Sequence, residues 1–170
     1  MFEVLVFVYE NYWRGDACPQ LDQLHRKLSA VGFEAEEIQD ALAWLGGLSL
    51  ATRNTQLTTT AQSTVQPAGT QLQPASVDQS RASMRVYSVD EQNRLGPACL
   101  GFINFLESSG VLPPHMREVV VDRAMASGSD GLELDDLKII VLMVYWSYGE
   151  EPDALILDEL CDDGIARVGH

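Results

Sequence analysis

The stretch from Asp90 to Tyr148 has the pattern of three consecutive helices that are built almost wholly from packing residues. Its last part, Leu132 to Trp146, is apolar on nearly every face of a helix. A helix of that kind has to lie inside a bundle of other elements. We therefore predict a helical bundle around this segment, and the stretch holds no set of residues typical of catalysis.

Length and charge limit the classes of partner. A chain of 170 residues with 46% hydrophobic residues can form one domain, or two small ones that share a core. Its net charge of −14 repels nucleic-acid phosphates and anionic membrane surfaces. The same charge suits a protein partner with a basic surface, although solubility alone also accounts for it.

The cysteines and the N-terminus indicate a cytoplasmic protein. The three cysteines, Cys18, Cys99 and Cys161, lack the spacing of a disulfide framework or a zinc site, so we expect free thiols. The apolar start carries Glu3 and Glu10 and has no basic region, unlike a signal peptide. The apolar run from Ile139 to Tyr148 is shorter than the roughly 20 residues that span a bilayer.

Charge and composition divide the chain into three parts. Residues 1–49 and 83–170 are acidic and rich in apolar residues, whereas residues 50–82 carry one acid and two bases. The middle part consists largely of Thr, Gln, Ser and Ala, with few large apolar side chains. Such a segment cannot bury enough surface to order itself, so residues 50–82 are predicted to be a flexible insertion.

Residues 1–49 are predicted to form three helices. The first runs from Phe2 to Trp13, and the second, from Leu21 to Val31, places apolar residues at helical spacing. The third runs from Glu34 to Leu45 and is expected to stop at the pair Gly46 and Gly47. The short connection around Gly32 is typical of a helix-turn-helix corner.

A small β-hairpin is expected between the two acidic parts. Alternating residues predict a strand from Ser83 to Ser88, and Leu48 to Leu57 would be its partner strand. The insertion would then be an enlarged wing tip. Three helices and a hairpin followed by a helix is the order of a winged-helix domain. The predicted fold is therefore mainly α, with a winged-helix-like N-terminal half packed on a C-terminal helical bundle.

The C-terminal bundle has recognisable helix boundaries. Ser88 and Glu91 form a capping-box pattern, and the helix that they open is expected to run to about Ser109. Pro113 and Pro114 begin the next helix. The buried helix follows from Leu134 to Tyr148, and Ala154 to Cys161 is predicted to be a last amphipathic helix.

Several motifs resemble the bacterial Smg family of uncharacterised proteins. They are Met1 to Leu5, Tyr9 to Tyr12, Leu28, Ala30 to Phe33, Ala41 to Leu45, Ser83 to Tyr87, Gly101-Phe102, Phe105 to Glu107, Asp135 to Lys138 and Val141 to Val144. The resemblance covers nearly the whole chain except the insertion and the last residues. It implies no settled activity. The family's genes are often found near those for a DNA-processing protein of natural transformation and for peptide deformylase, which implies a link to DNA processing.

The chain shows no pattern of an enzyme or of a cofactor site. None of its histidines, His25, His115 and His170, is paired with a cysteine by a recognisable motif. No Gly-Lys-Ser/Thr phosphate loop follows Gly46-Gly47. The acidic cluster from Asp130 to Asp136 lacks the loop pattern of a cation site and is typical of a helix N-terminus. We expect no enzymatic activity, no cofactor and no metal.

The candidate interaction residues are acidic and aromatic. A DNA-reading helix needs Arg, Lys, Asn or Gln on its exposed face, but the helix at this position carries Glu34, Glu36, Glu37, Gln39 and Asp40 and no basic residue. Aromatic side chains near helix ends often remain exposed at interfaces, although most are expected in the core. The candidates are Tyr12, Trp13, Glu34, Glu37, Asp40, Arg85, Tyr87, Trp146 and Tyr148.

Three functions fit these observations. The first is a non-enzymatic, acidic, cytoplasmic protein that binds another protein with a basic surface. The second is a winged-helix regulator that binds nucleic acid through Arg26, Lys27, Arg81 and Arg85. The third is an acidic mimic of nucleic acid that blocks a basic groove. The charge and the acidic helix favour the first.

Overall fold

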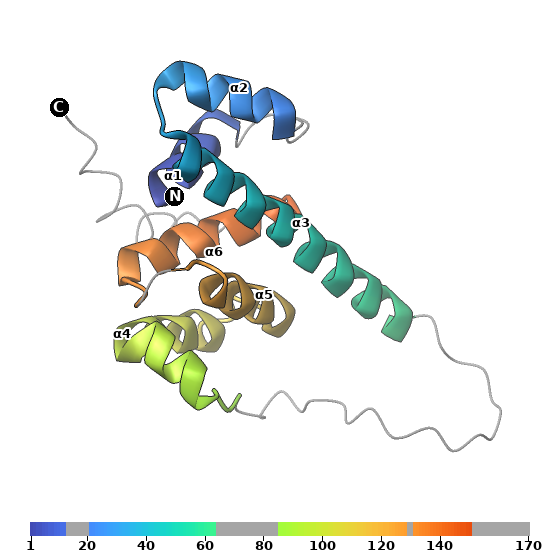
Figure 1. Cartoon of the computed structure of the whole chain (residues 1–170). Coiled ribbons are helices and arrows are strands. Elements are labelled where there is room, and N and C mark those ends of the chain that lie inside the picture. Colours follow the sequence, from blue (N-terminus) through green and yellow to red (C-terminus); the bar gives the residue numbers. More distant parts are fainter. Residues whose placement is uncertain (13–20, 64–84, 129–130, 151–170) are drawn as a thin grey trace.

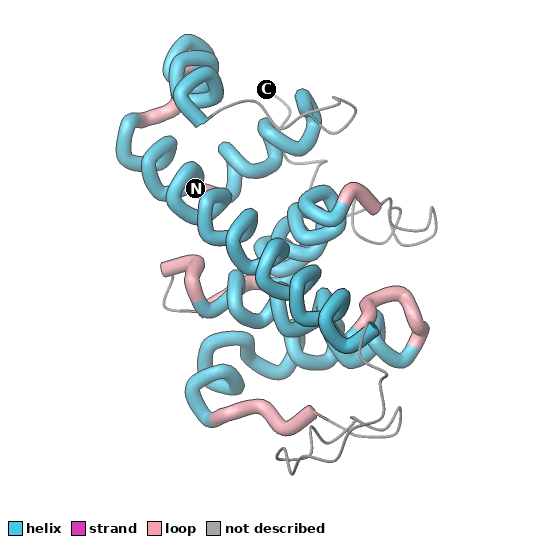
Figure 2. Tube along the Cα trace, turned by 90° about the vertical axis from the view of Figure 1, so that its right-hand side faces the viewer, coloured by secondary structure: helices cyan, strands magenta, loops and turns pink. Residues whose placement is uncertain are grey.

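The computed structural model describes residues 1–12, 21–63, 85–128 and 131–150. The described residues form six helices and no strand (Figures 1 and 2). The helices are α1 (Phe2–Tyr12), α2 (Leu21–Val31), α3 (Ala35–Ser63), α4 (Val89–Ser108), α5 (Pro114–Met125) and α6 (Leu134–Tyr148). The mainly α class is confirmed, and the helix predicted over Ala154 to Cys161 lies outside the described residues.

Helix α6 lies at the centre of the molecule. It contacts α1, α3, α4 and α5 (Figure 1). Its residues from Ile140 to Tyr145 are all buried, and Leu137 is completely inaccessible. This confirms the prediction of a helix that is apolar nearly all round. No described helix is long and apolar enough to span a membrane.

Helices α1 to α3 follow the order predicted from the sequence. Gly32 adopts a φ of 111°, a left-handed conformation that favours glycine, and it ends α2. α2 packs mainly on α3, where it buries Leu24 and Leu28. Val31 keeps the helical spacing of those leucines, but it is 56% exposed.

The predicted end of the third helix at Gly46 and Gly47 is wrong. α3 continues through both glycines to Ser63, so Leu48 to Leu57 is helical and forms no strand. A side chain at position 47 would overlap the guanidinium of Arg123 on α5. The glycine therefore serves the close approach of α5 to α3. Residues 64–82 of the predicted insertion lie outside the described residues.

The predicted winged-helix hairpin is also wrong. Arg85 to Ser88 form no strand, while Ser83 and Met84 lie outside the described residues. Instead, this segment leads directly into α4 through the predicted capping box. The Glu91 amide donates to Ser88 Oγ over 3.2 Å, and the Ser88 amide donates to Glu91 Oε2 over 2.8 Å. Local capping therefore decides the structure here.

The C-terminal helices begin and end near the predicted residues. α4 is kinked at Gly96, where φ is 66°, immediately before Pro97. α5 begins at Pro114, and Gly110 ends the preceding turn with a φ of 75°. These two helices pack against one another and against α6, below the α1–α2 pair in Figure 1.

Candidate interaction surfaces

A groove lies where α1, α3 and the end of α5 meet. We call it the N-terminal groove. It has a volume of about 570 Å³ and is lined by Met1, Phe2, Asp40, Ala43, Trp44, Arg123, Ala126, Ser127 and Gly128. The Trp44 ring is buried, and its Nε1 donates to the Arg123 carbonyl oxygen over 3.0 Å. This bond fixes the indole at one wall of the groove, whose lining is both polar and apolar.

Exposed carboxylates lie at the start of α3, and one of them lines this groove. Glu34, Glu36 and Asp40 are exposed, and Asp40 itself lines the groove. Glu37 is half-buried and pairs with the Met1 α-amino group at 3.5 Å. Two of the three predicted acidic candidates therefore face solvent, while the third binds the N-terminus. No Arg or Lys lies between residues 34 and 43, so this end of α3 is acidic.

Arg85 joins α4 to α5 in a network of ion pairs. Arg85 Nη2 lies 2.9 Å from Glu91 Oε1, and Arg85 Nε lies 2.9 Å from Glu118 Oε1. Arg117, which is buried, binds the same Glu118 at 2.8 Å and also binds Glu107. Because Arg85 already has two carboxylate partners, its guanidinium takes part in ion pairs within the protein.

This network changes the titration of its members. The hydrogen bonds from Arg85 lower the pKa of Glu91 to about 2, against the opposing effect of burial. Its carboxylate partners hold the pKa of Arg85 above its usual value. The Tyr87 ring lies 4.5 Å from the Arg85 guanidinium carbon. Burial raises the pKa of Tyr87, and among the described residues its hydroxyl has no hydrogen-bond partner.

The remaining aromatic candidates do not gather on one surface. Tyr12 is half-buried at the end of α1 and faces α2, while Trp13 lies outside the described residues. Trp146 is half-buried and packs against the core. The Tyr148 ring makes an edge contact with His115 of α5, with ring centres 5.5 Å apart. Burial raises the pKa of Tyr148.

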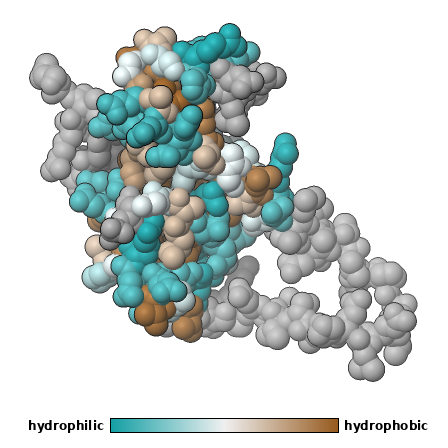
Figure 3. Space-filling model, viewed as in Figure 1, coloured by the Kyte–Doolittle hydropathy of each residue, from teal (hydrophilic) through white to brown (hydrophobic). Residues whose placement is uncertain are grey.

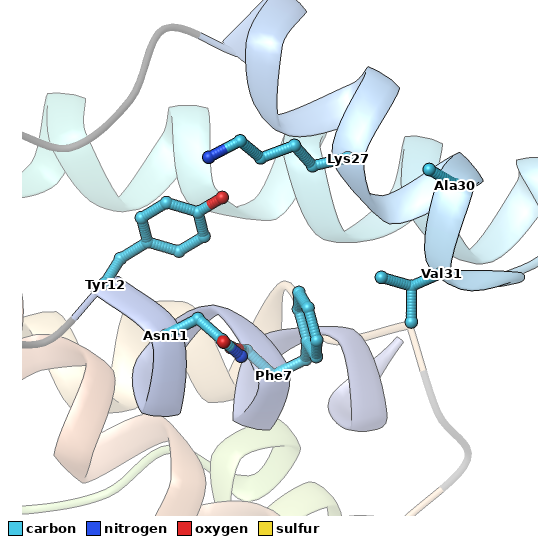
Figure 4. Close-up of a pocket in the computed structure, with 6 residues that line it drawn as sticks. All are labelled: Phe7, Asn11, Tyr12, Lys27, Ala30 and Val31. Atoms are coloured by element: carbon cyan, nitrogen blue, oxygen red, sulfur yellow. The ribbon is translucent and has the colours of Figure 1, made fainter.

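A second groove lies between α1 and α2, and we call it the α1/α2 groove. It has a volume of about 330 Å³ and is lined by Phe7, Asn11, Tyr12, Lys27, Ala30 and Val31 (Figure 4). The sequence analysis did not predict this groove, because Val31 keeps the helical spacing of Leu24 and Leu28, which are buried. The single signal was the position of Val31 beside Gly32, where the end of a helix can leave an apolar side chain uncovered.

The described residues hold no group of three His, Cys, Asp or Glu side chains placed to bind a metal ion. The carboxylates at the start of α6 lie next to one another without forming such a group. Burial raises the pKa of Asp136, and the neighbouring charge of Glu133 adds to the rise. On the face shown in Figure 3, hydrophilic and apolar residues are interspersed, and no single apolar patch covers it.

Comparison with known proteins places the whole chain in one family. The family described as "Protein of unknown function (DUF494)" matches residues 1–170. A Protein Smg homolog of Leptothrix cholodnii is 59% identical over 170 residues, and one of Methylibium petroleiphilum is 56% identical over 170 residues. A Protein Smg homolog of Bordetella avium is 46% identical over the same length. Each alignment covers 100% of both chains, the Thr/Gln-rich segment included.

No solved structure matches this chain. The family match and the alignments with the relatives cover the entire chain, which confirms the predicted resemblance to the Smg family. The chain belongs to the DUF494 family, with the proteins named Protein Smg homolog among its relatives.

Proposed function

We propose that this protein is a non-enzymatic, cytoplasmic adaptor that binds a protein with a basic surface at the N-terminal groove. One observation carries the proposal: the exposed carboxylate of Asp40 lines a groove in which the indole of Trp44 is held in a fixed position. Aromatic residues in a pocket provide binding energy, and charges at the rim select partners and speed association. A basic peptide with one large apolar side chain has the chemistry that this groove would recognise.

The acidic end of α3 supports a protein partner over nucleic acid. In the helix-turn-helix arrangement the start of this helix would face DNA, yet the exposed charges there are those of Glu34, Glu36 and Asp40. Carboxylates in that position would meet phosphates on both sides of a DNA groove. Arg85, a predicted phosphate contact, is bound by Glu91 and Glu118. Arg81 lies outside the described residues.

A charge-reversal pair tests the proposal. The tagged full chain would be used to purify partners from its native host after nuclease treatment, and the affinity of the identified partner would then be measured. Asp40→Lys is expected to weaken binding about tenfold or more, equivalent to about 1.4 kcal/mol. Glu10→Lys changes an equally exposed acid of α1 that lines neither groove, so it serves as the matched control.

The measurement separates the proposal from its alternatives. Binding that survives nuclease, weakens with salt and falls only in Asp40→Lys supports the adaptor. Equal losses in Asp40→Lys and Glu10→Lys would show that net charge alone attracts the partner. Partners that disappear with nuclease would show bridging by nucleic acid. Turnover of a small substrate that survives mutation controls would refute the non-enzymatic part of the proposal.

A further inference from the structure

The α1/α2 groove has an apolar wall and a positively charged rim. Phe7 and Val31 form the wall, with Ala30 beside them, and Val31 is 56% exposed (Figure 4). The Lys27 side chain extends across the opening, with its ammonium nitrogen 5.1 Å from the centre of the Tyr12 ring. An apolar surface beside an exposed cation fits a segment that is both aliphatic and acidic.

Helix α2 is the positive part of an acidic protein. Among the described helices it is the one in which bases outnumber acids, with Arg26 and Lys27 against Asp22. Within the described part of the chain, Lys27 makes its contact with the Tyr12 ring and has no carboxylate within ion-pair distance. An acidic segment would therefore be attracted to α2 and repelled from most other surfaces.

The chain itself contains a segment of this chemistry. Residues 151–163 carry six acids and no base, together with Leu155, Ile156, Leu157 and Leu160. The sequence predicts an amphipathic helix over Ala154 to Cys161. A helix of this kind binds a groove through its apolar face, while its charges meet the rim.

The connection is long enough for this segment to reach the groove. Residues 151–153 connect Glu150, the last described residue, to the predicted helix and would span about 10 Å if extended, and the helix over residues 154–161 would add about 12 Å. A domain of this size has a radius of gyration of about 15 Å. Because both partners belong to one chain, their effective concentration is on the order of millimolar, so a modest affinity suffices.

We propose that residues 151–163 dock in the α1/α2 groove, with their aliphatic side chains over Phe7 and Val31 and their carboxylates toward Arg26 and Lys27. Docking covers the exposed apolar side chains and neutralises the positive surface of α2. The surface that remains for other molecules is then more uniformly acidic. The inference stands independently of the function proposed for the N-terminal groove, because it concerns other residues.

Disulfide trapping in the full chain tests the docking. Ala30→Cys places a thiol in the α1/α2 groove, and the native Cys161 lies in the docking segment. Cys18→Ser is included throughout, while Cys99 is buried and remains. Oxidised glutathione accepts the two electrons when the thiols join. The rate of formation of the intramolecular disulfide would be followed by non-reducing electrophoresis and peptide mapping.

Ala43→Cys is the matched control, since Ala43 is also an exposed helical alanine but lines the N-terminal groove. We expect Ala30→Cys to cross-link with Cys161 at least about fivefold faster than Ala43→Cys does. Lys27→Glu, added to Ala30→Cys, should slow the cross-link roughly fivefold, and Lys27→Arg should leave its rate within about twofold. Raising the salt concentration should slow it as well.

Circular dichroism and thermal melting would establish that each variant is folded. Equal rates of cross-linking to Cys161 in Ala30→Cys and Ala43→Cys would overturn the proposal. A cross-linking rate that Lys27→Glu leaves unchanged would also overturn it. A predominance of disulfide-linked dimers at low protein concentration would also overturn it, because the groove would then bind a second copy. The function proposed for the N-terminal groove would be unaffected by any of these outcomes.

Discussion

Gly47 of α3 lies directly against the guanidinium of Arg123 of α5, whereas its neighbour Gly46 has no atom of another element within 4 Å of the position of a Cβ. The two glycines are adjacent in one helix, so they share the same intrinsic propensity. They differ in what surrounds them. This difference makes them a matched pair for measuring the cost of the close approach between α3 and α5.

Gly46→Ala should stabilise the protein by about 0.5–1 kcal/mol, because alanine is the better helix former and meets no neighbour. Gly47→Ala gains the same propensity but must displace Arg123, which is paired with Asp122 at 2.7 Å. We expect its free energy of unfolding to lie about 1 kcal/mol or more below that of Gly46→Ala. Urea unfolding of both variants measures the difference, and equal stabilities would contradict the close approach.

The ion pair of Glu91 predicts how stability depends on pH. Its folded pKa of about 2 lies below the ordinary value of 4.5, so the pair contributes fully above pH 4.5. The contribution is lost as pH falls from 4.5 toward 2, since the unfolded state binds the proton first. Glu91→Gln should be less stable than the natural chain at pH 7, and this gap should narrow below pH 4.5. A gap that stays constant down to pH 2 would show that Glu91 is not ion-paired.

Cys99 should be protected from thiol reagents in the folded protein. It is 1% exposed, its Sγ donates to the Leu132 carbonyl oxygen over 3.4 Å, and burial raises its pKa. In a chain with Cys18→Ser and Cys161→Ser, labelling by an aromatic disulfide at pH 8 should be slow and should accelerate with urea. Labelling at the rate of an unfolded peptide in native buffer would contradict this burial.

The second helix offers a direct comparison between buried and exposed positions. Leu28 is fully buried, so Leu28→Ala should cost about 2–5 kcal/mol in the free energy of unfolding. Val31 is 56% exposed, and Val31→Ala should cost less than about 1 kcal/mol. Thermal or urea unfolding of both variants measures these changes in the free energy of unfolding. A segment docked from residues 151–163 would cover Val31 only from outside the helix bundle and should not raise its cost to that of Leu28, so similar costs at the two positions would contradict the difference in burial.

Local patterns predicted most of the helices but not the contacts between them. The capping box of Ser88 and Glu91 and the proline at the start of α5 are local signals, and both are found in the structure. The apolar character of α6 predicted its central position. These features depend on residues within one or two turns of each other, so the sequence displays them.

The errors arose where distant residues decide the local structure. A glycine pair is a common helix stop, but Arg123 comes from another helix, and its approach to Gly47 leaves no mark near Gly47 in the sequence. Arg85 to Ser88 alternate like a strand, although Glu118 of α5 holds Arg85 and Val86 is 87% exposed. Both grooves depend on how helices pack, so only some of their rim residues could be predicted.

The continuity of α3 has a consequence for dissecting the protein. The helix contacts α1 and α2 on one side of the molecule and α5 and α6 on the other (Figure 1). A cut after residue 49 would sever it between Leu48, which is fully buried, and Thr52, whose hydroxyl bonds Ser147 of α6 at 2.9 Å. Each fragment made by this cut would expose buried residues that pack against the other fragment in the whole protein. The smallest unit that can be transplanted into another protein is therefore the whole set of six helices, because α3 contacts α1, α2, α5 and α6.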